Sequence, residues 1–365
     1  MHGGDVYGAA RELGQDPSTM LDFSASINPL GPSASALRAF RRSANLLPHY
    51  PDPACWDLRQ ALAAHWQRPA DEFLIGNGST ELIHILPRAL GIRRLLIIGP
   101  TFSEYAAAMD CSAGQVTATM AERTDGYRPP LEAVRRLLTG SAEEKEGRAS
   151  FDALVLCNPN SPTGQACEVK QVMTVARLAA RLGVWLLLDE TFTEYCEPAS
   201  ILSERLPATT LVLRSFTKFY GLPAVRIGYV VAHVRVIERL KARQPPWSVN
   251  MPAQVAAVAA LRDKTHARRS LTFMARERAR LLVELQRLPG CVAFPSEANF
   301  ILLELPVGER ARTIVAALRR QGLLIRDCSM VAGLNDRTVR VAVRSTSDNT
   351  RLLRALSQAL GGKAS

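Results

Sequence analysis

The 365-residue sequence lacks several features that would place it in a specialised class of protein. No apolar run reaches the roughly 18 residues that a membrane-spanning helix needs. The first residues do not combine a basic region with an apolar one, so we expect no signal peptide. The seven cysteines are scattered, odd in number and without a C-x-x-C pair. This pattern favours reduced thiols over disulfides or a metal site, and it predicts a cytoplasmic protein without membrane association.

Lysine is scarce, and the basic residues are not grouped. Six of the 45 basic residues are lysines, and the formal net charge is +11, yet no block of five or six like charges occurs. The arginines spread through helical segments, as at Arg268-Arg269. Proteins that bind nucleic acids more often gather basic residues on one face or tail. We therefore expect a solvated, arginine-rich surface that attracts small anionic substrates, and no nucleic-acid partner.

Short apolar runs alternate with helical patterns between about residues 75 and 232. The pattern predicts buried strands and one clear helix in this region. The strands are 95–99, 153–157, 184–188 and 211–214, and the helix is 169–182. Strand, helix, strand in repetition predicts an α/β fold with a large, mainly parallel sheet and helices on both faces.

Beyond residue 232 the pattern changes, and we predict a small α+β domain. Its predicted elements are helices over 252–288, strands at 291–294 and 299–305, a helix near 309–321, a strand at 338–343 and a closing helix. The N-terminal residues would complete this domain. The predicted division is 1–45 for the N-terminal segment of the small domain, 46–250 for the large domain, and 251–365 for linking helices and the C-terminal part of the small domain.

Polar residues follow the predicted strands at the edge where ligands of parallel sheets gather. Asp189 follows one strand, and Lys218 follows the next, with Ser215 before it and Arg226 eight residues after it. Pyridoxal phosphate (PLP) needs an amine for its aldehyde, cations and hydroxyls for its phosphate, and a carboxylate for its ring nitrogen. The chain supplies all three, which predicts a PLP site. The alternatives are a surface lysine and a carboxylate that only caps a turn.

A small-residue segment at a predicted helix start would hold the cofactor phosphate. Gly78, Ser79 and Thr80 precede the apolar helical run 82–90. Backbone N–H groups at a helix N-terminus, together with the helix dipole, bind phosphate well. Ser79 or Thr80 could equally be a plain N-cap.

Two further positions would contact the cofactor ring. Phe102 would stack on its face, with Tyr105 as the fallback, although core packing is the alternative for this aromatic residue. Ser161 lies in the proline-rich turn 158–164, whose rigid backbone could hold the ring oxygen. We therefore place both positions at the predicted site.

Two arginines mark the C-terminal region. Arg340 lies inside an apolar strand, where a guanidinium is costly unless it meets an anion. Together with Arg326 it predicts a substrate that carries two acidic groups. The alternative is a surface or interface ion pair.

These residues together resemble the fold-type-I, PLP-dependent aminotransferase superfamily over nearly the whole chain. Four segments are similar to the L-threonine-O-3-phosphate decarboxylase family of cobalamin biosynthesis: His2-Gly3-Gly4, 22–32, 49–53 and 340–345. The alternative is the histidinol-phosphate aminotransferase family, which shares the lysine, aspartate and arginines. A third hypothesis, a DNA-binding regulator with this fold, would leave the complete lysine, aspartate and arginine set without a purpose.

The resemblance implies decarboxylation of a small phosphorylated amino acid, O-phospho-L-threonine, to 1-amino-2-propanol phosphate and CO₂. It also implies a role for each matching position. Lys218 would bind the cofactor aldehyde and Asp189 its ring nitrogen. The phosphate would be held by Ser215, Arg226, Ser79 and the Gly78 backbone, and by Tyr50 from the other subunit of a homodimer with shared active sites. The substrate would be held by His2, Gly3, Asn28, Arg326 and Arg340.

Two positions depart from the superfamily pattern. Ser161 stands where the superfamily usually has an asparagine bonded to the ring oxygen. Phe192, three residues after Asp189, occupies a place where transaminases usually carry a tyrosine. Both changes remove a donor to the ring oxygen, and Phe192 favours the decarboxylase over the transaminase.

Overall fold

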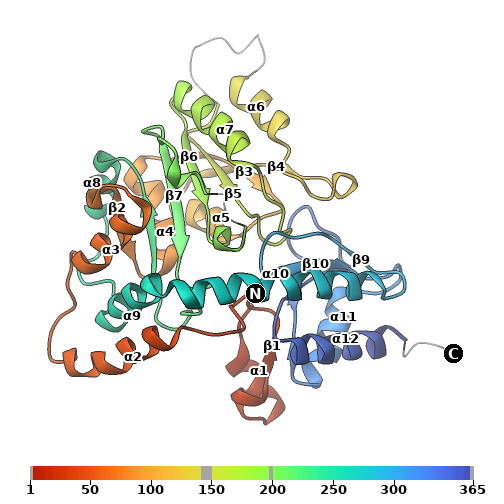
Figure 1. Ribbon diagram of the computed structural model, residues 1–365. Helices are drawn as coiled ribbons and strands as arrows, with labels where there is room; N and C mark the ends of the chain where they lie inside the picture. Colours follow the sequence, from red (N-terminus) through yellow and green to blue (C-terminus); the bar gives the residue numbers. More distant parts are fainter. Residues whose placement is uncertain (1–2, 141–149, 197–199, 362–365) are drawn as a thin grey trace.

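The computed structural model describes residues 3–140, 150–196 and 200–361, and a seven-stranded sheet forms its centre (Figure 1). The strand order is β2-β8-β7-β6-β5-β3-β4, and β8 runs antiparallel to both of its neighbours. The strands are β2 (Phe73–Gly76), β3 (Arg94–Gly99), β4 (Gln115–Met120), β5 (Ala153–Cys157), β6 (Trp185–Asp189), β7 (Thr210–Ser215) and β8 (Gly228–Val231). The central strands are apolar on both faces because helices cover both sides.

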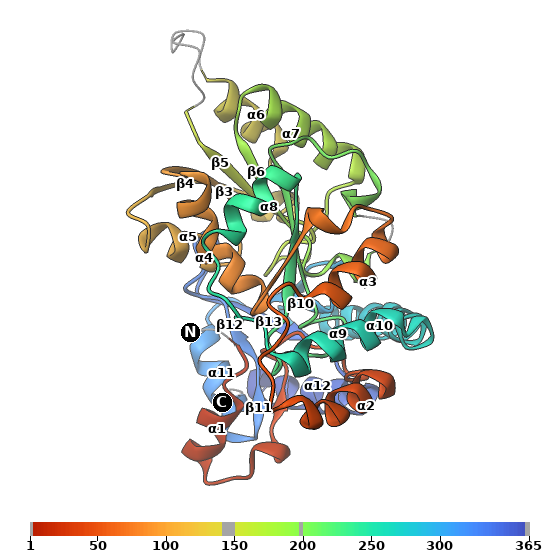
Figure 2. The same ribbon diagram turned by 90° about the vertical axis from the view of Figure 1, so that its left-hand side faces the viewer.

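Each face of this sheet packs against its own apolar cluster, and Figure 2 shows α4 and α8 on one side with α3 on the other. One cluster includes residues of α3 (Trp56–Trp66), α6 (Leu131–Thr139), α7 (Val169–Arg181) and α9 (Met251–Arg262). The other includes residues of α4 (Gly78–Leu90), α5 (Glu104–Asp110) and α8 (Val234–Lys241). Because side chains alternate along a strand, Leu186 and Leu188 join one cluster and Leu187 joins the other.

A second sheet, with strand order β12-β13-β10-β9, is antiparallel throughout and lies in the C-terminal region (Figure 1). Its strands are β9 (Val292–Ala293), β10 (Phe300–Glu304), β12 (Arg326–Asp327) and β13 (Thr338–Ala342). The N-terminal strand β1 (Leu21–Asp22) pairs in parallel with β11 (Leu323–Leu324), so the two ends of the chain meet. The remaining helices are α1 (Val6–Leu13), α2 (Ala34–Arg42), α10 (Lys264–Gln286), α11 (Ala311–Arg320) and α12 (Thr346–Gly361). Short 3-10 helices occupy Pro17–Thr19, Ser43–Leu46, Ala70–Glu72, Arg123–Asp125, Thr193–Tyr195 and Ile201–Ser203.

Several helix starts are capped by a side chain, and among those that are not, the start of α4 matters for the site. Asn250 caps α9, because its side-chain oxygen accepts a hydrogen bond from the Ala253 N–H at 2.8 Å. Asp263 does the same for α10 through the His266 N–H at 3.0 Å, which breaks the predicted helical stretch into two helices. At α4, by contrast, the side chain of Asn77 makes no capping bond within the described chain. The first N–H groups of α4 therefore remain open to an anion.

The predicted fold class is confirmed. A large, mainly parallel sheet has helices on both faces, and the two ends of the chain form a small α+β unit. The four strands and the helix predicted within 95–214 match the structure to within one residue at each end. The domain boundaries stay a prediction, and α2, which falls within 1–45, packs against α9. Among the described residues, none of the helices has the length and apolarity that crossing a bilayer would require.

Candidate active site

The carboxyl ends of β5, β6 and β7 lie at one edge of the large sheet. In register, Cys157 pairs with Asp189 and Asp189 pairs with Leu213. Ser215 ends β7, and Lys218 follows three residues later. The predicted aspartate, serine and lysine are therefore at the rim where ligands of parallel sheets bind.

The environment of Lys218 lowers its pKa from the ordinary 10.5 to about 8. Burial removes water from the ammonium group and is the main cause, and the positive charges of Arg340 and Arg226 add to it. The Nζ atom lies 5.8 Å from the centre of the Phe192 ring. Because only the neutral amine attacks an aldehyde, this environment suits the predicted role of Lys218.

This shifted pKa predicts a pH effect on the cofactor-free protein. Below pH 8 the folded chain holds an ammonium group in a place that disfavours it, so replacing Lys218 with methionine should stabilise the fold at pH 7 by about 3 kcal/mol. Between pH 8 and 10.5 the unfolded chain keeps the proton and the folded chain releases it, so wild-type stability should rise with pH in that window. Urea unfolding of wild type and Lys218→Met at pH 7 and pH 10 measures this gain. A stability difference between the two proteins that is equal at both pH values would contradict it.

Asp189 is a buried carboxylate with two fixed donors. Its Oδ1 accepts a hydrogen bond from the Thr191 N–H at 2.9 Å, and its Oδ2 accepts one from the Tyr105 hydroxyl at 2.9 Å. Among the described residues, no lysine or arginine forms an ion pair with it. A buried carboxylate without a cation is costly, which favours a cationic ligand at this position.

The phosphate end of the predicted site is shaped by glycines. A Cβ atom added to Gly78 would lie 2.5 Å from Nη2 of Arg226, and one added to Gly228 would lie 2.6 Å from the Ser79 nitrogen. Gly78 has a φ of +76°, which favours glycine, and at Gly228 only glycine lets β8 approach the backbone at the start of α4 this closely. Ser79 and Thr80 lie inside the first turn of α4, so the alternative that either is the N-cap is wrong.

Arg326 and Arg340 face each other directly across β12 and β13, so their side chains lie on the same face of the sheet. Nη1 of Arg340 donates to Ser161 Oγ at 2.9 Å, and Nη2 donates to the Ser24 carbonyl at 2.8 Å. Its Nε is buried and has no hydrogen-bond partner among the described residues. Burial and the charge of Arg326 lower the pKa of Arg340.

Arg326 and Arg340 carry like charges on neighbouring strands, which favours an anion between or beside the two guanidinium groups. Neither arginine forms an ion pair with a carboxylate of the residues that the structure describes, so of the alternatives only an ion pair across an interface stays open. The guanidinium carbon of Arg340 lies 4.8 Å from the centre of the Phe300 ring, which fixes the plane of the group. The pair is therefore suited to bind an anion, and its contact with substrate stays a prediction.

Two predicted contacts have other partners in the structure. Ser161 accepts a hydrogen bond from Arg340, so it lies beside the predicted substrate arginine, and its contact with the ring oxygen stays a prediction. Asn28 is buried, and its amide nitrogen donates to the Phe219 carbonyl and to Ser270 Oγ, both at 2.8 Å. Its backbone N–H also donates to the Lys218 carbonyl at 3.0 Å. Asn28 therefore supports the Lys218 loop, and its role in substrate binding stays a prediction.

The N-terminal residues approach the arginine pair. A Cβ atom added to Gly3 would lie 2.3 Å from the Ser24 carbonyl oxygen, which accepts the hydrogen bond from Arg340. Gly3 is thus beside the predicted substrate site, whereas His2 lies outside the described residues. Tyr50 is 80% exposed, and its ring centre lies 5.0 Å from that of Trp247. Its contact with a partner's cofactor stays a prediction.

Sequence reasoning missed two residues of this site. Tyr105 is the fallback for ring stacking in the sequence analysis, but in the structure it is buried and donates a hydrogen bond to Asp189. Stacking by Phe102 stays a prediction. Ser24 was not singled out, although it lies in the N-terminal segment that carries the family resemblance. Arg340 contacts the backbone carbonyl of Ser24, which every residue type has, so the sequence gives no sign of this contact.

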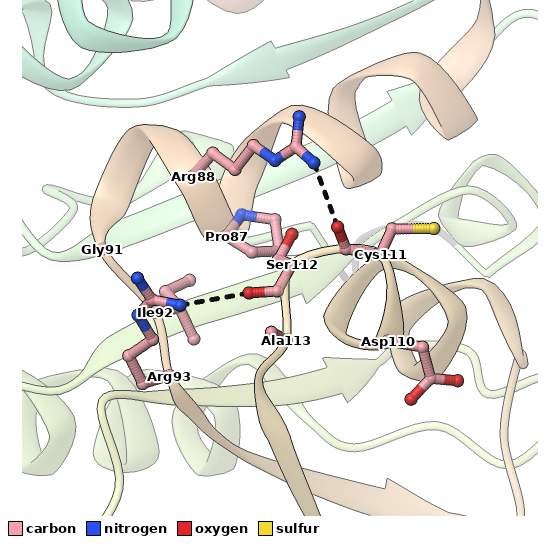
Figure 3. Close-up of a pocket in the computed structure, with 9 residues that line it drawn as sticks. All are labelled: Pro87, Arg88, Gly91, Ile92, Arg93, Asp110, Cys111, Ser112 and Ala113. Carbon is pink, nitrogen blue, oxygen red and sulfur yellow. Dashed lines mark hydrogen bonds between the residues drawn. The ribbon is translucent and has the colours of Figure 1, made fainter.

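A separate cavity of about 410 Å³ lies between the ends of α4 and α5 (Figure 3). Arg88 and Arg93 donate to the carbonyls of Cys111 and Ser112 at 3.0 and 3.1 Å there. None of the described site residues lines this cavity. It is therefore distinct from the rim that holds Lys218.

The chain matches the family described as aminotransferase class I and II over residues 18–356. It is 37% identical to threonine-phosphate decarboxylase of Salmonella typhimurium, over 100% of this chain and 97% of that protein. It is 34% identical to histidinol-phosphate aminotransferase of Symbiobacterium thermophilum, over 98% and 95% of the two chains.

Two solved structures have the same fold. Histidinol-phosphate aminotransferase from Clostridium acetobutylicum has a TM-score of 0.85 and 26% identity, and L-threonine-O-3-phosphate decarboxylase from Porphyromonas gingivalis has 0.78 and 25%. Each match covers 94% of this chain and 100% of the other. The chain belongs to the class I and II aminotransferase family, which is PLP-dependent. The predicted superfamily and cofactor are confirmed.

The described residues fit PLP. The open N–H groups of α4, the glycine-made approach at Gly78 and the guanidinium of Arg226 suit a phosphate. Asp189 is a buried acceptor without a cation, which suits a protonated ring nitrogen. Lys218 is an amine that loses its proton readily. The three groups lie at one rim, in the arrangement that the cofactor requires.

Proposed function

We propose that the protein is a PLP-dependent carboxy-lyase that converts O-phospho-L-threonine to 1-amino-2-propanol phosphate and CO₂. The observation that carries this proposal is the pair Arg326 and Arg340, which lie side by side without a carboxylate partner among the described residues. A substrate with a phosphate and a carboxylate supplies an anion for each. The full-length similarity to threonine-phosphate decarboxylase supports the same substrate, and a place in cobalamin biosynthesis goes with it.

PLP, when bound, supplies a cationic ring that accepts the electron pair left at Cα when CO₂ departs. Asp189 would accept the hydrogen bond of the ring N–H. Lys218, with a pKa of about 8, can hold a proton and release it near neutral pH. It would deliver that proton to Cα, so that a Cα–H bond replaces the broken bond to the carboxylate.

The two arginines would decide which bond breaks. A bond to Cα breaks easily only when it stands perpendicular to the cofactor ring, because its electrons then overlap the ring π system. Arg326 and Arg340 would hold both anionic groups and turn the Cα–carboxylate bond into that direction. Binding energy from the remote phosphate would thus serve orientation at the reacting atom.

An assay of two products tests this function. The PLP-loaded protein is incubated with O-phospho-L-threonine and CO₂ release is followed, while a parallel sample receives histidinol phosphate and 2-oxoglutarate and is scored for glutamate. We expect CO₂ without glutamate. Glutamate without CO₂ would instead support the second candidate, a histidinol-phosphate aminotransferase, which the relative of 34% identity favours.

We also propose a homodimer in which Tyr50 enters the phosphate site of the other subunit. Three large apolar side chains close to Tyr50 in sequence or in space are exposed: Leu47 at 74%, Trp56 at 58%, and Trp247, whose ring contacts that of Tyr50, at 49%. Clusters of this kind on a monomer surface mark interaction sites. A partner copy would cover them and bring each Tyr50 toward a second active site.

Replacing Leu47 with glutamate should shift the protein from dimer to monomer, because a charge would enter the covered apolar surface. Light scattering after size exclusion measures the mass, which is expected to fall from twice 39.9 kDa to 39.9 kDa. Val307→Glu is the matched control, because Val307 is an aliphatic residue that is 90% exposed in the C-terminal region, and this variant should remain a dimer. A wild-type monomer, or equal masses for both variants, would contradict the proposed surface.

Two further proposals, on cellular location and on nucleic-acid binding, rest mainly on the sequence. All seven cysteines are free thiols in the structure, which supports a reducing, cytoplasmic location. We propose no nucleic-acid partner, since small anions suffice to explain the arginine pair.

A further inference from the structure

Tyr105 connects a helix to the predicted ring-nitrogen site. It lies in the first turn of α5, is 2% exposed, and packs within the apolar cluster on one face of the large sheet. Its hydroxyl points at Asp189 and donates to Oδ2 at 2.9 Å. The other carboxylate oxygen is held by the Thr191 N–H, so the two donors fix the carboxylate from both sides.

The phenol acts as a donor over the whole working pH range. Burial, and next the negative charge of Asp189, raise the pKa of Tyr105 well above its ordinary value. The hydroxyl therefore keeps its proton and does not become a second negative charge. Among the described residues, Oδ2 of Asp189 accepts a hydrogen bond from Tyr105 alone.

A hydrogen bond donated to a carboxylate favours its charged form. When a carboxylate and a ring nitrogen share one proton, such a donor shifts the proton toward the nitrogen. We propose that Tyr105 is a positioning residue that acts through Asp189 to keep the shared proton on the cofactor's ring nitrogen. This inference rests on the proposed pairing of Asp189 with that nitrogen, and it does not depend on which substrate the protein accepts.

The competing explanation is that Tyr105 only fills the core and satisfies its own hydroxyl. A core role would change the stability of the fold without changing where the ring proton resides. Tyr229 offers a matched control because it is also a buried tyrosine, and its hydroxyl accepts a hydrogen bond from Trp66 Nε1 at 3.0 Å, away from Asp189.

The first measurement is the ¹⁵N NMR signal of PLP labelled at its ring nitrogen and bound to the protein. In wild type and in Tyr229→Phe we expect the signal of a protonated ring nitrogen. In Tyr105→Phe the signal should move toward that of a neutral pyridine. An unchanged signal in Tyr105→Phe would overturn the proposal.

A second measurement uses a PLP analogue in which a C–H group replaces the ring nitrogen. Wild type should bind this analogue more weakly than PLP. Tyr105→Phe should reduce the affinity for PLP about tenfold, as expected for a lost hydrogen bond to a charged group, and leave the affinity for the analogue unchanged. An equal loss for both ligands would mean that Tyr105 has only a core role, whereas equal binding of both ligands by wild type would overturn the pairing of Asp189 with the ring nitrogen.

A third experiment replaces Tyr105 with an analogue and is informative even if Tyr105→Phe does not fold. Fluorotyrosine incorporated at this position keeps the hydroxyl and the shape and makes the phenol a stronger donor. We expect the ¹⁵N signal to remain that of a protonated ring nitrogen or to move further toward it. Movement toward the signal of a neutral pyridine would overturn the proposal, and none of these readouts requires turnover, so their failure is separate from a failure of the decarboxylase assignment.

Discussion

Replacing Lys218 with alanine is expected to stop release of CO₂ from O-phospho-L-threonine, with a loss in turnover on the order of 10⁴-fold or more. The variant lacks the amine that would bind the cofactor aldehyde and carry the proton to Cα. Lys218 is partly buried and has a pKa of about 8, and among the described residues it forms no ion pair. The fold should therefore survive its removal. Trapping of released CO₂ measures the loss, and circular dichroism checks the fold.

Two controls make this result specific. Lys170→Ala removes an exposed lysine of α7 and should retain full activity. A small primary amine added to Lys218→Ala should restore part of the turnover, because alanine leaves space for it. Persistent decarboxylation by Lys218→Ala would contradict the assignment of the catalytic lysine, whichever substrate is used.

Replacing Arg340 with lysine should lower kcat/KM for O-phospho-L-threonine about a hundredfold, although the positive charge is kept. The planar guanidinium contacts Ser161, Ser24 and the Phe300 ring at the same time, and its buried Nε remains available to an anion. An ammonium group cannot reproduce this geometry. Arg310→Lys, at an exposed ion pair with Asp336, is the control and should behave as wild type.

Inhibitors that carry one acidic group each would divide the roles of the two arginines. L-Threonine has the carboxylate without the phosphate, and phosphoethanolamine has the phosphate without the carboxylate. If Arg340 binds the carboxylate, Arg340→Lys should weaken inhibition by L-threonine and leave phosphoethanolamine unaffected, and Arg326→Lys should do the reverse. Unchanged inhibition by both compounds in both variants would show that neither arginine binds substrate.

Local sequence was enough to predict the central part of the fold and the residue types of the site. The strands β3, β5, β6 and β7 are short apolar runs, and the helix α7 has a clear apolar period, so local composition was sufficient to place them. Asp189 and Lys218 could be predicted to lie together because the carboxyl ends of parallel strands share one edge. β2, β4 and β8 were missed because β4 is largely exposed and has no apolar run, and β2 and β8 have four residues each.

The contacts between these residues depend on long-range packing, which local sequence does not reveal. Tyr105 and Asp189 are 84 positions apart, and Asn28 bonds to Phe219 and Ser270, which lie 191 and 242 positions away. Arg326 faces Arg340 because of the register between β12 and β13, and a shift by one residue would put the two side chains on opposite faces. Residue types and spacing predicted the chemistry of the site. Its hydrogen bonds could be read only from the structure, because register and long-range packing depend on how the whole chain folds.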